Sequence, residues 1–128
     1  MGRSAAAVAC GAVAGAAVRW AVAEAVPTDG GWPWAVLAVN VIGAFLLGLV
    51  LVATRHRTDD ATNDPIRLAL GTGFCGALTT FSTLAVDVAS GLRGGETSRA
   101  VGVLVVSVVV GVAAFVAGRA LAVRREPS

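Results

Sequence analysis

The sequence has no lysine, a single histidine and few charged residues of any kind. Asp, Glu, Lys and Arg make up only 14% of the 128 residues, whereas hydrophobic residues make up 56% and the mean hydropathy is +0.80. A soluble domain carries about 25% charged residues. The composition therefore argues against an ordinary soluble domain and for a chain that lies mostly in lipid.

The shortage of histidine and of charge excludes several functional classes. His56, between Arg55 and Arg57, is a lone histidine, so neither a catalytic triad nor a histidine metal site is expected. The pI near 9.0 reflects a formal charge of only +2 without a basic cluster, so we expect no nucleic-acid binding. The longest charged segment, residues 55–67, is too short for a catalytic domain, and we predict that the protein is not an enzyme.

Four stretches contain no Asp, Glu, Lys or Arg, apart from Arg19 near the end of the first: residues 4–23, 32–54, 68–86 and 100–118. At about 1.5 Å rise per residue, each is long enough as a helix to cross the roughly 30 Å hydrocarbon core of a bilayer. We predict an all-α integral membrane protein in which residues 1–128 form one domain of four transmembrane helices.

The first stretch could be mistaken for a cleaved signal peptide, because Arg3 precedes an apolar run. The run continues past the usual length to Arg19 and contains Gly11 and Gly15, a spacing that lets membrane helices approach closely. We therefore expect a transmembrane helix. The cysteines, Cys10 and Cys75, lie inside apolar stretches and are expected to be small packed side chains.

The arginines outside the stretches are distributed unequally between the two sides that a four-helix topology creates. Two lie on one side, Arg93 and Arg99. Seven lie on the side of the termini: Arg3, Arg55, Arg57, Arg67, Arg119, Arg124 and Arg125. The positive-inside rule then predicts that both termini are cytoplasmic.

The second stretch carries a polar residue at membrane depth. Asn40, Ala44 and Gly48 recur every four residues and share a helix face, which should turn inward because an Asn side chain is costly to expose to lipid. Two interpretations remain open. The Asn40 side chain bonds to another helix, or its amide donates to a ligand in a pore.

The third stretch combines helix-breaking and polar residues. Glycine occupies positions 71, 73 and 76, and four hydroxyl side chains follow within five residues: Thr79, Thr80, Ser82 and Thr83. A continuous helix would turn some of those hydroxyls toward lipid, whereas a broken helix frees backbone groups that can hold ions. We predict a broken helix; the alternative is a flexible helix whose hydroxyls bond to their own backbone.

Two further residues are weaker candidates for an ion path. Phe81 lies among the hydroxyls, and the positive edge of its ring could face an anion, although core packing is the usual role of Phe. Ser107 is one of the few polar residues of the fourth stretch. It is as compatible with a bond to its own helix as with lining a path.

Three segments together are similar to a known family: GAVAGAAVRW (residues 11–20), WPWAVLAVNVIGAFLLG (32–48) and GFCGALTTFST (73–83). They resemble the CrcB/Fluc family of fluoride channels in order, spacing and overall length. The resemblance implies an antiparallel dimer of four-helix subunits in the cell membrane, formed by the chain with itself or with a paired family member. It further implies two narrow pores that export cytoplasmic fluoride passively, conferring fluoride resistance, and a structural Na⁺ at the centre.

The resemblance also assigns roles to individual residues. Gly76 and Thr79 occupy the positions whose backbone carbonyls hold the Na⁺, and Arg19 occupies a vestibule position. The fluoride pore positions are occupied by Asn40, Thr80, Phe81, Ser82, Thr83 and Ser107. The chain departs from the family pattern at Leu84, where a second Phe is usual, at Val103, where a Tyr is frequent, and at Gly111, where a Ser is frequent. These departures raise the question of whether every pore built by this subunit conducts.

The arginine bias adds a hypothesis about the partner. A subunit that inserts in both orientations should show little bias, so seven arginines against two favour one half of a heterodimer. Two other functions are weighed. A small proton-coupled exporter needs a carboxylate inside the membrane, and Asp87 and Glu24 lie only at the edges of the stretches. A non-conducting accessory subunit would use its polar residues only for packing.

Overall fold

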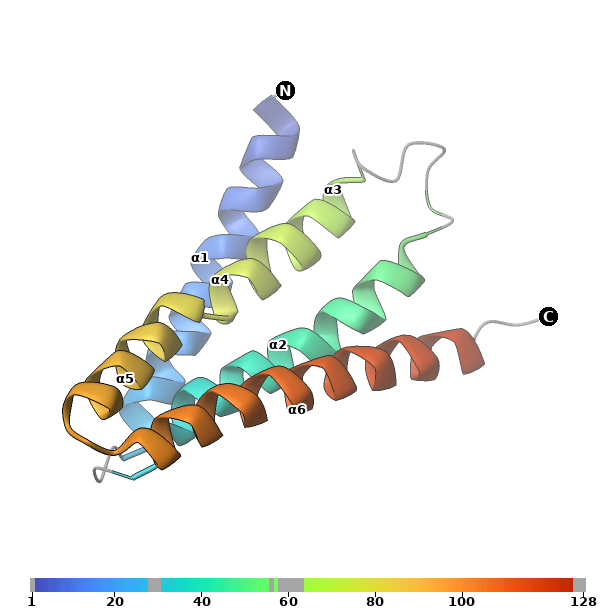
Figure 1. Ribbon diagram of the computed structural model, residues 1–128. Helices are drawn as coiled ribbons and strands as arrows, with labels where there is room; N and C mark the ends of the chain where they lie inside the picture. Colours follow the sequence, from blue (N-terminus) through green and yellow to red (C-terminus); the bar gives the residue numbers. More distant parts are fainter. Residues whose placement is uncertain (1, 28–30, 56, 58–63, 126–128) are drawn as a thin grey trace.

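A computed structural model describes residues 2–27, 31–55, 57 and 64–125; His56 lies outside these ranges. Four helical segments are long and apolar enough to cross a membrane (Figure 1). They are α1 (Gly2–Ala25), α2 (Trp34–Ala53), a composite third segment (Pro65–Arg93) and α6 (Thr97–Arg124). The predicted all-helical architecture with four spans is confirmed, and the described part of the chain contains no strand.

The third segment is built from four pieces. It begins with α3 (Pro65–Arg67), continues through the π-helical η1 (Leu68–Cys75) and α4 (Gly76–Leu78), and resumes as α5 (Phe81–Arg93). Asp64 starts it as an N-cap, because its carboxylate accepts the N–H of Ile66 at 3.0 Å. The glycines of η1 suit the widened turn of a π-helix, a form found mostly at functional sites.

The predicted interruption lies at Thr79 and Thr80. Thr79 has a ψ of 151°, and Thr80 has φ −143° and ψ 116°, so both leave the helical region. The chain re-enters a helix at once because the Thr80 hydroxyl caps α5, accepting the N–H of Thr83 at 3.2 Å. The third helix is therefore bent where the hydroxyl-rich sequence begins.

Glycine permits the closest helix contacts. A Cβ at Gly11 or Gly15 of α1 would collide with the backbone carbonyls of Ala69 and Phe74 in η1. Gly48 of α2 and Gly118 of α6 face each other in the same way, since a Cβ on either would strike a backbone carbonyl of the opposite helix. Hydrophobic burial does not drive helix association in lipid, so close van der Waals packing at small residues stabilises these contacts instead.

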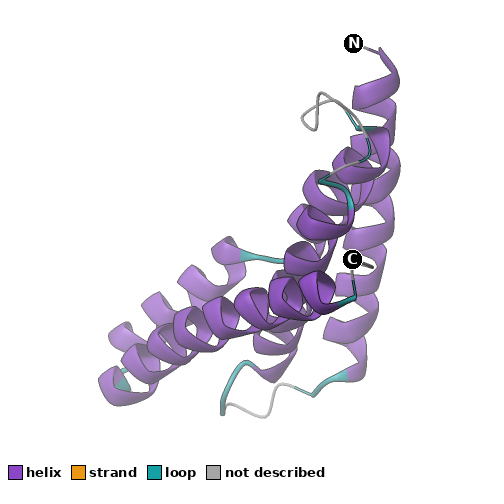
Figure 2. Ribbon diagram, turned by 90° about the vertical axis from the view of Figure 1, so that its right-hand side faces the viewer, coloured by secondary structure: helices purple, strands orange, loops and turns teal. Residues whose placement is uncertain are grey.

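The helices are splayed rather than parallel. In Figure 1, α1 with the α3–α4 arm and α2 with α6 form two pairs that diverge toward the side where both termini lie. Figure 2 shows the molecule from a second direction, with the loop that separates α5 from α4 in teal. The accessible surface is 7860 Å², whereas a compact monomer of 12.7 kDa would expose about 6,200 Å². The fold leaves apolar surface for lipid or another chain to cover.

Candidate functional site

Asn40 of α2 bonds to the interrupted backbone. Its Oδ1 accepts the N–H of Thr80 at 2.7 Å, and its Nδ2 donates to the C=O of Thr80 at 3.1 Å. A backbone N–H released at membrane depth must find a partner in the protein, and this amide accepts that of Thr80 while donating to the C=O of the same residue. The interhelical interpretation of Asn40 is therefore seen directly. The amide retains a second N–H for another acceptor.

The break also changes the bonding of two backbone carbonyls. In a continuous α-helix the N–H of Thr80 would bond to the C=O of Gly76, and the N–H of Thr83 to the C=O of Thr79. Both donors are instead used elsewhere, by Asn40 Oδ1 and by the Thr80 hydroxyl. The carbonyls of Gly76 and Thr79 are thereby released from their helical partners.

Gly76 and Thr79 line a groove of about 540 Å³ between α2 and the third helix, with Gly43, Ala44 and Thr72 among the other lining residues. A Cβ built on Gly76 would meet nothing within 4 Å, so this surface is open. The described residues contain no cluster of three His, Cys, Asp or Glu side chains. Carbonyl oxygens suit a hard cation, so the groove fits Na⁺ better than a metal that prefers nitrogen or sulfur.

The four hydroxyls differ in their partners. Thr79 Oγ1 donates to the C=O of Cys75 at 2.9 Å, a bond within its own helix. Thr80 Oγ1 lies 2.9 Å from Thr83 Oγ1 and 3.3 Å from Ser82 Oγ, so these three form a cluster at the start of α5. Thr80 is buried, whereas Ser82 and Thr83 are exposed.

A cavity of about 240 Å³ lies beside the break, between α2, α5 and α6. It is lined by Asn40, Thr79, Thr80, Phe81, Leu84, Ser107 and Val108. Ser107 is only 8% exposed, and its hydroxyl has no hydrogen-bond partner among the described residues. The Ser107 hydroxyl therefore does not bond to its own helix, and the side chain lies at the cavity wall. An unpaired buried hydroxyl is costly, and a ligand in the cavity would supply its partner.

Arg19 lies at a second cavity, of about 340 Å³, between α1, α2 and α5. Ser82, Thr83 and Thr80 line the same cavity. Thr80 borders both cavities, so the two lie on either side of the α5 N-terminus. The structure thus brings all the candidate residues of the ion path to one region, with Arg19 supplying a positive charge.

Comparison with known proteins identifies the family. A sequence model of the family described as CrcB-like protein, camphor resistance (CrcB), matches residues 6–119. The chain belongs to the CrcB family. A fluoride-specific ion channel FluC of Bordetella avium is 45% identical over 102 residues, which are 79% of this chain and 78% of that protein.

Other CrcB relatives cover more of the chain. Fluoride-specific ion channel FluC 1 of Mycobacterium bovis is 41% identical over 113 residues, covering 88% of this chain and 84% of the relative. The FluC of Ignicoccus hospitalis is 39% identical over 117 residues, 91% and 93% of the two chains. The predictions of a membrane channel family and of a protein that is not an enzyme are confirmed.

Two of the three departures expected from the resemblance, Leu84 and Val103, are buried, whereas a Cβ at the third, Gly111, would meet nothing within 4 Å. Leu84 is 4% exposed and Val103 is fully buried, so both pack the α5–α6 contact, and Leu84 also borders the cavity of Asn40 and Ser107. Phe81 is 75% exposed and lines the same cavity. Leu84 therefore replaces an aromatic ring with an aliphatic side chain at the cavity wall.

Sequence reasoning missed one set of contacts in this CrcB chain. Asp87 was considered only as a possible proton carrier, but the structure pairs it with Arg99 at 3.4 Å. The sequence alternative of a proton-coupled exporter gave Asp87 a different role from this contact with Arg99. The Glu96 and Arg99 spacing of three residues was the available signal, since such pairs meet on a helix.

Proposed function

We propose that this chain is the subunit of a fluoride-selective channel that lets cytoplasmic fluoride leave the cell passively. The observation that carries the proposal is the buried, unpartnered hydroxyl of Ser107, in a cavity shared with the Asn40 amide. Fluoride is a small, strong hydrogen-bond acceptor, and these groups are donors. The named relatives, described as fluoride-specific channels, support the choice of ion.

The path we infer runs along the N-terminal end of α5. Arg19 attracts the anion at one cavity, the hydroxyls of Ser82, Thr83 and Thr80 replace part of its hydration shell, and Asn40 and Ser107 receive it in the other cavity. The positive end of the α5 dipole favours an anion along this route. The positive edge of the Phe81 ring is the expected contact at the exposed side.

A second subunit would complete the channel. The splayed helices leave the α2–third helix groove open, and Phe81 is exposed, as expected of residues that meet another chain. In an antiparallel dimer the two grooves would face each other, and the Gly76 and Thr79 carbonyls of both subunits could surround one structural Na⁺. The open groove and the two released carbonyls support this arrangement.

The arginine distribution supports a fixed orientation with cytoplasmic termini. The side of the termini has seven arginines and the other side two, and Arg99 of those two is held by acidic side chains. In an antiparallel dimer, a chain that inserts in one orientation needs a partner that inserts in the other. We therefore infer a heterodimer with a paired subunit of the same family, with the homodimer as the second arrangement.

Fluoride efflux from liposomes tests the function. Vesicles loaded with fluoride and containing the purified protein are followed with a fluoride electrode, first alone and then with a paired subunit of the family. Fluoride efflux that does not respond to chloride supports a fluoride-selective channel. Efflux from vesicles that contain this chain alone establishes the homodimer. Absence of efflux under both conditions would contradict the proposal and favour an accessory subunit.

A further inference from the structure

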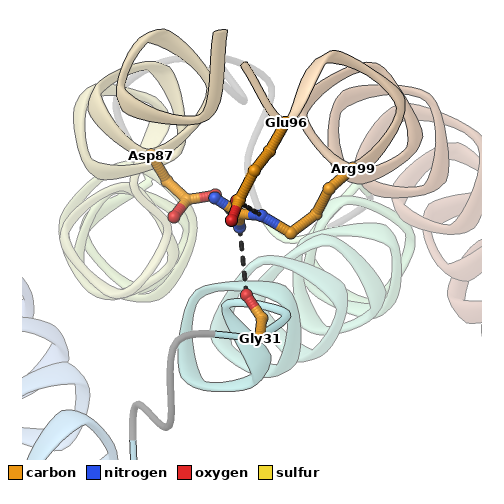
Figure 3. A network of polar contacts seen from close by, with 4 residues as sticks. All are labelled: Gly31, Asp87, Glu96 and Arg99. Atoms are coloured by element: carbon orange, nitrogen blue, oxygen red, sulfur yellow. Dashed lines mark hydrogen bonds and ion pairs between the residues drawn. The ribbon is translucent and has the colours of Figure 1, made fainter. Parts of the chain in front are cut away.

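Arg99, in the first turn of α6, bonds to three separate parts of the chain (Figure 3). Its Nε donates to Glu96 Oε2 at 2.6 Å, and its Nη1 lies 3.0 Å from the C=O of Gly31 and 3.4 Å from Asp87 Oδ2. The acceptors belong to the start of α6, the connection before α2, and α5. One guanidinium therefore links three segments at the side opposite the termini.

We propose that Arg99 is a positioning residue of the channel, which holds α5 through Asp87 and so sets the geometry of the Thr80–Thr83 hydroxyls. The inference rests on the proposed fluoride path along α5. Its physical basis is the way in which α5 is attached to the rest of the molecule.

The start of α5 is not continuous with α4 as a helix, because Thr79 and Thr80 separate the two helices in extended conformations. The Asn40–Thr80 bonds hold this end. Asp87 follows Thr80 by seven residues, which is nearly two full turns, so Thr80 and Asp87 lie on the same face. Asn40 and Arg99 thus hold two points of one face, about two turns apart.

The same face of α5 packs on α6. Leu84 and Gly91 are buried on α5, and Ala100 and Val103 are buried on α6. A Cβ on Gly91 would come within 3.1 Å of Arg99 Nη2 and 3.2 Å of Ala100 Cβ, so the two helices approach closely beneath the guanidinium. A shift of α5 along α6 would therefore change the Asp87–Arg99 contact and, at the same time, displace the Thr80–Thr83 hydroxyls.

The exposure of these groups argues that their role is geometric. The side chains of Arg99 and Asp87 are 21% and 28% exposed, and that of Glu96 is 55% exposed. Ion pairs with such access to solvent contribute little stability. The planar guanidinium, however, fixes the directions of its donors, so it can set the relative position of three segments.

A double-mutant cycle tests the proposal. We compare Asp87→Asn, Arg99→Gln and the double variant by fluoride efflux per folded protein, in the liposome assay and with whichever subunit arrangement conducts. Each single variant is expected to lower efflux by about tenfold, and the double variant to match Arg99→Gln, because the Asp87–Arg99 contact is already lost in that variant. Arg93→Gln is the control, since it removes an exposed arginine from the same side outside this network.

A second measurement reports α5 without requiring flux. Ser82→Cys is placed in a Cys10→Ala background, where Cys75 remains buried, and its reaction with an aqueous thiol reagent is timed. Arg99→Gln and Asp87→Asn should each change the rate by at least about threefold, and Arg93→Gln should not. Wild-type rates of thiol reaction, or additive losses of efflux in the double variant, would overturn the inference. If no arrangement conducts, the proposed function fails and the thiol rates alone decide the role of Arg99.

Discussion

Asn40 bonds to both backbone groups of Thr80, which lies 40 residues further along the chain, at the point where the third helix is interrupted. The contact has two effects. It satisfies the Thr80 N–H, which the interruption leaves without a helical acceptor, and it adds a second donor to the Thr80 C=O. One side chain thus stabilises the bend and releases a carbonyl for another ligand.

Asn40→Asp tests this contact. A carboxylate can accept the Thr80 N–H but cannot donate to the Thr80 C=O, and it places negative charge on the inferred anion path. We expect fluoride efflux to fall by at least about tenfold. Thermal unfolding in detergent, measured in parallel, separates loss of flux from loss of fold. Unchanged efflux would remove Asn40 from the path.

Ser107→Ala separates stability from conduction. Removing an unpaired buried hydroxyl should leave the free energy of unfolding unchanged or raise it by about 1 kcal/mol. Efflux should nevertheless fall by about tenfold, because the cavity loses a donor. Ser90→Ala, at an exposed position of α5, is the control. Equal efflux from Ser107→Ala and the wild type would show that the hydroxyl does not contact the ion.

Gly118→Ala tests the α2–α6 crossing. Its Cβ would collide with the backbone carbonyl of Phe45, so we expect a loss of at least about 2 kcal/mol in the free energy of unfolding. Gly111→Ala in the same helix is the matched control, because a Cβ there meets nothing within 4 Å. It should be neutral or gain up to about 1 kcal/mol from helix propensity. Similar losses in both variants would contradict the close crossing.

Asp64 tests the start of the third helix. Asp64→Ala removes the cap on Ile66 and should cost about 1 kcal/mol of unfolding free energy. Asp64→Asn keeps an oxygen for the cap and loses only the ion pair with Arg57, whose side chain is 49% exposed. Its cost should be the smaller, at most about 1 kcal/mol. Denaturation of both variants in the same detergent measures the two costs, and equal costs would assign the stabilisation to the ion pair, which both variants lose.

Thr79→Ala tests the assignment of the cation site to backbone oxygens. The Thr79 hydroxyl donates to the C=O of Cys75. Because the proposed site uses the backbone carbonyl, removal of this hydroxyl should leave sodium dependence intact. Replacing Na⁺ by a bulky organic cation should weaken subunit association by about tenfold in the wild type and in Thr79→Ala alike. Analytical ultracentrifugation in detergent follows the association. A sodium response lost only in Thr79→Ala would indicate that the side chain is the ligand.

Several features follow from local sequence alone. The four stretches that carry no charge apart from Arg19 determine the spans, because a bilayer tolerates few charges and requires about 20 residues per helix. The bend near Thr79 was predictable because glycines and hydroxyls both weaken a helix over a few consecutive residues. The arginine bias between the two sides of the membrane likewise follows from the sequence once the number of spans is known.

The pairings were decided by tertiary structure. Asn40 had two open interpretations from sequence, and only the placement of α2 beside the break shows that its side chain holds Thr80. Ser107 could have bonded to its own helix, but the α5–α6 packing leaves its hydroxyl facing a cavity. Arg99 and Asp87 meet because α5 and α6 run antiparallel from a tight turn. The spans follow from the hydrophobicity of each segment, because lipid surrounds it. The contacts depend on tertiary packing, which brings together helices that are far apart in the chain.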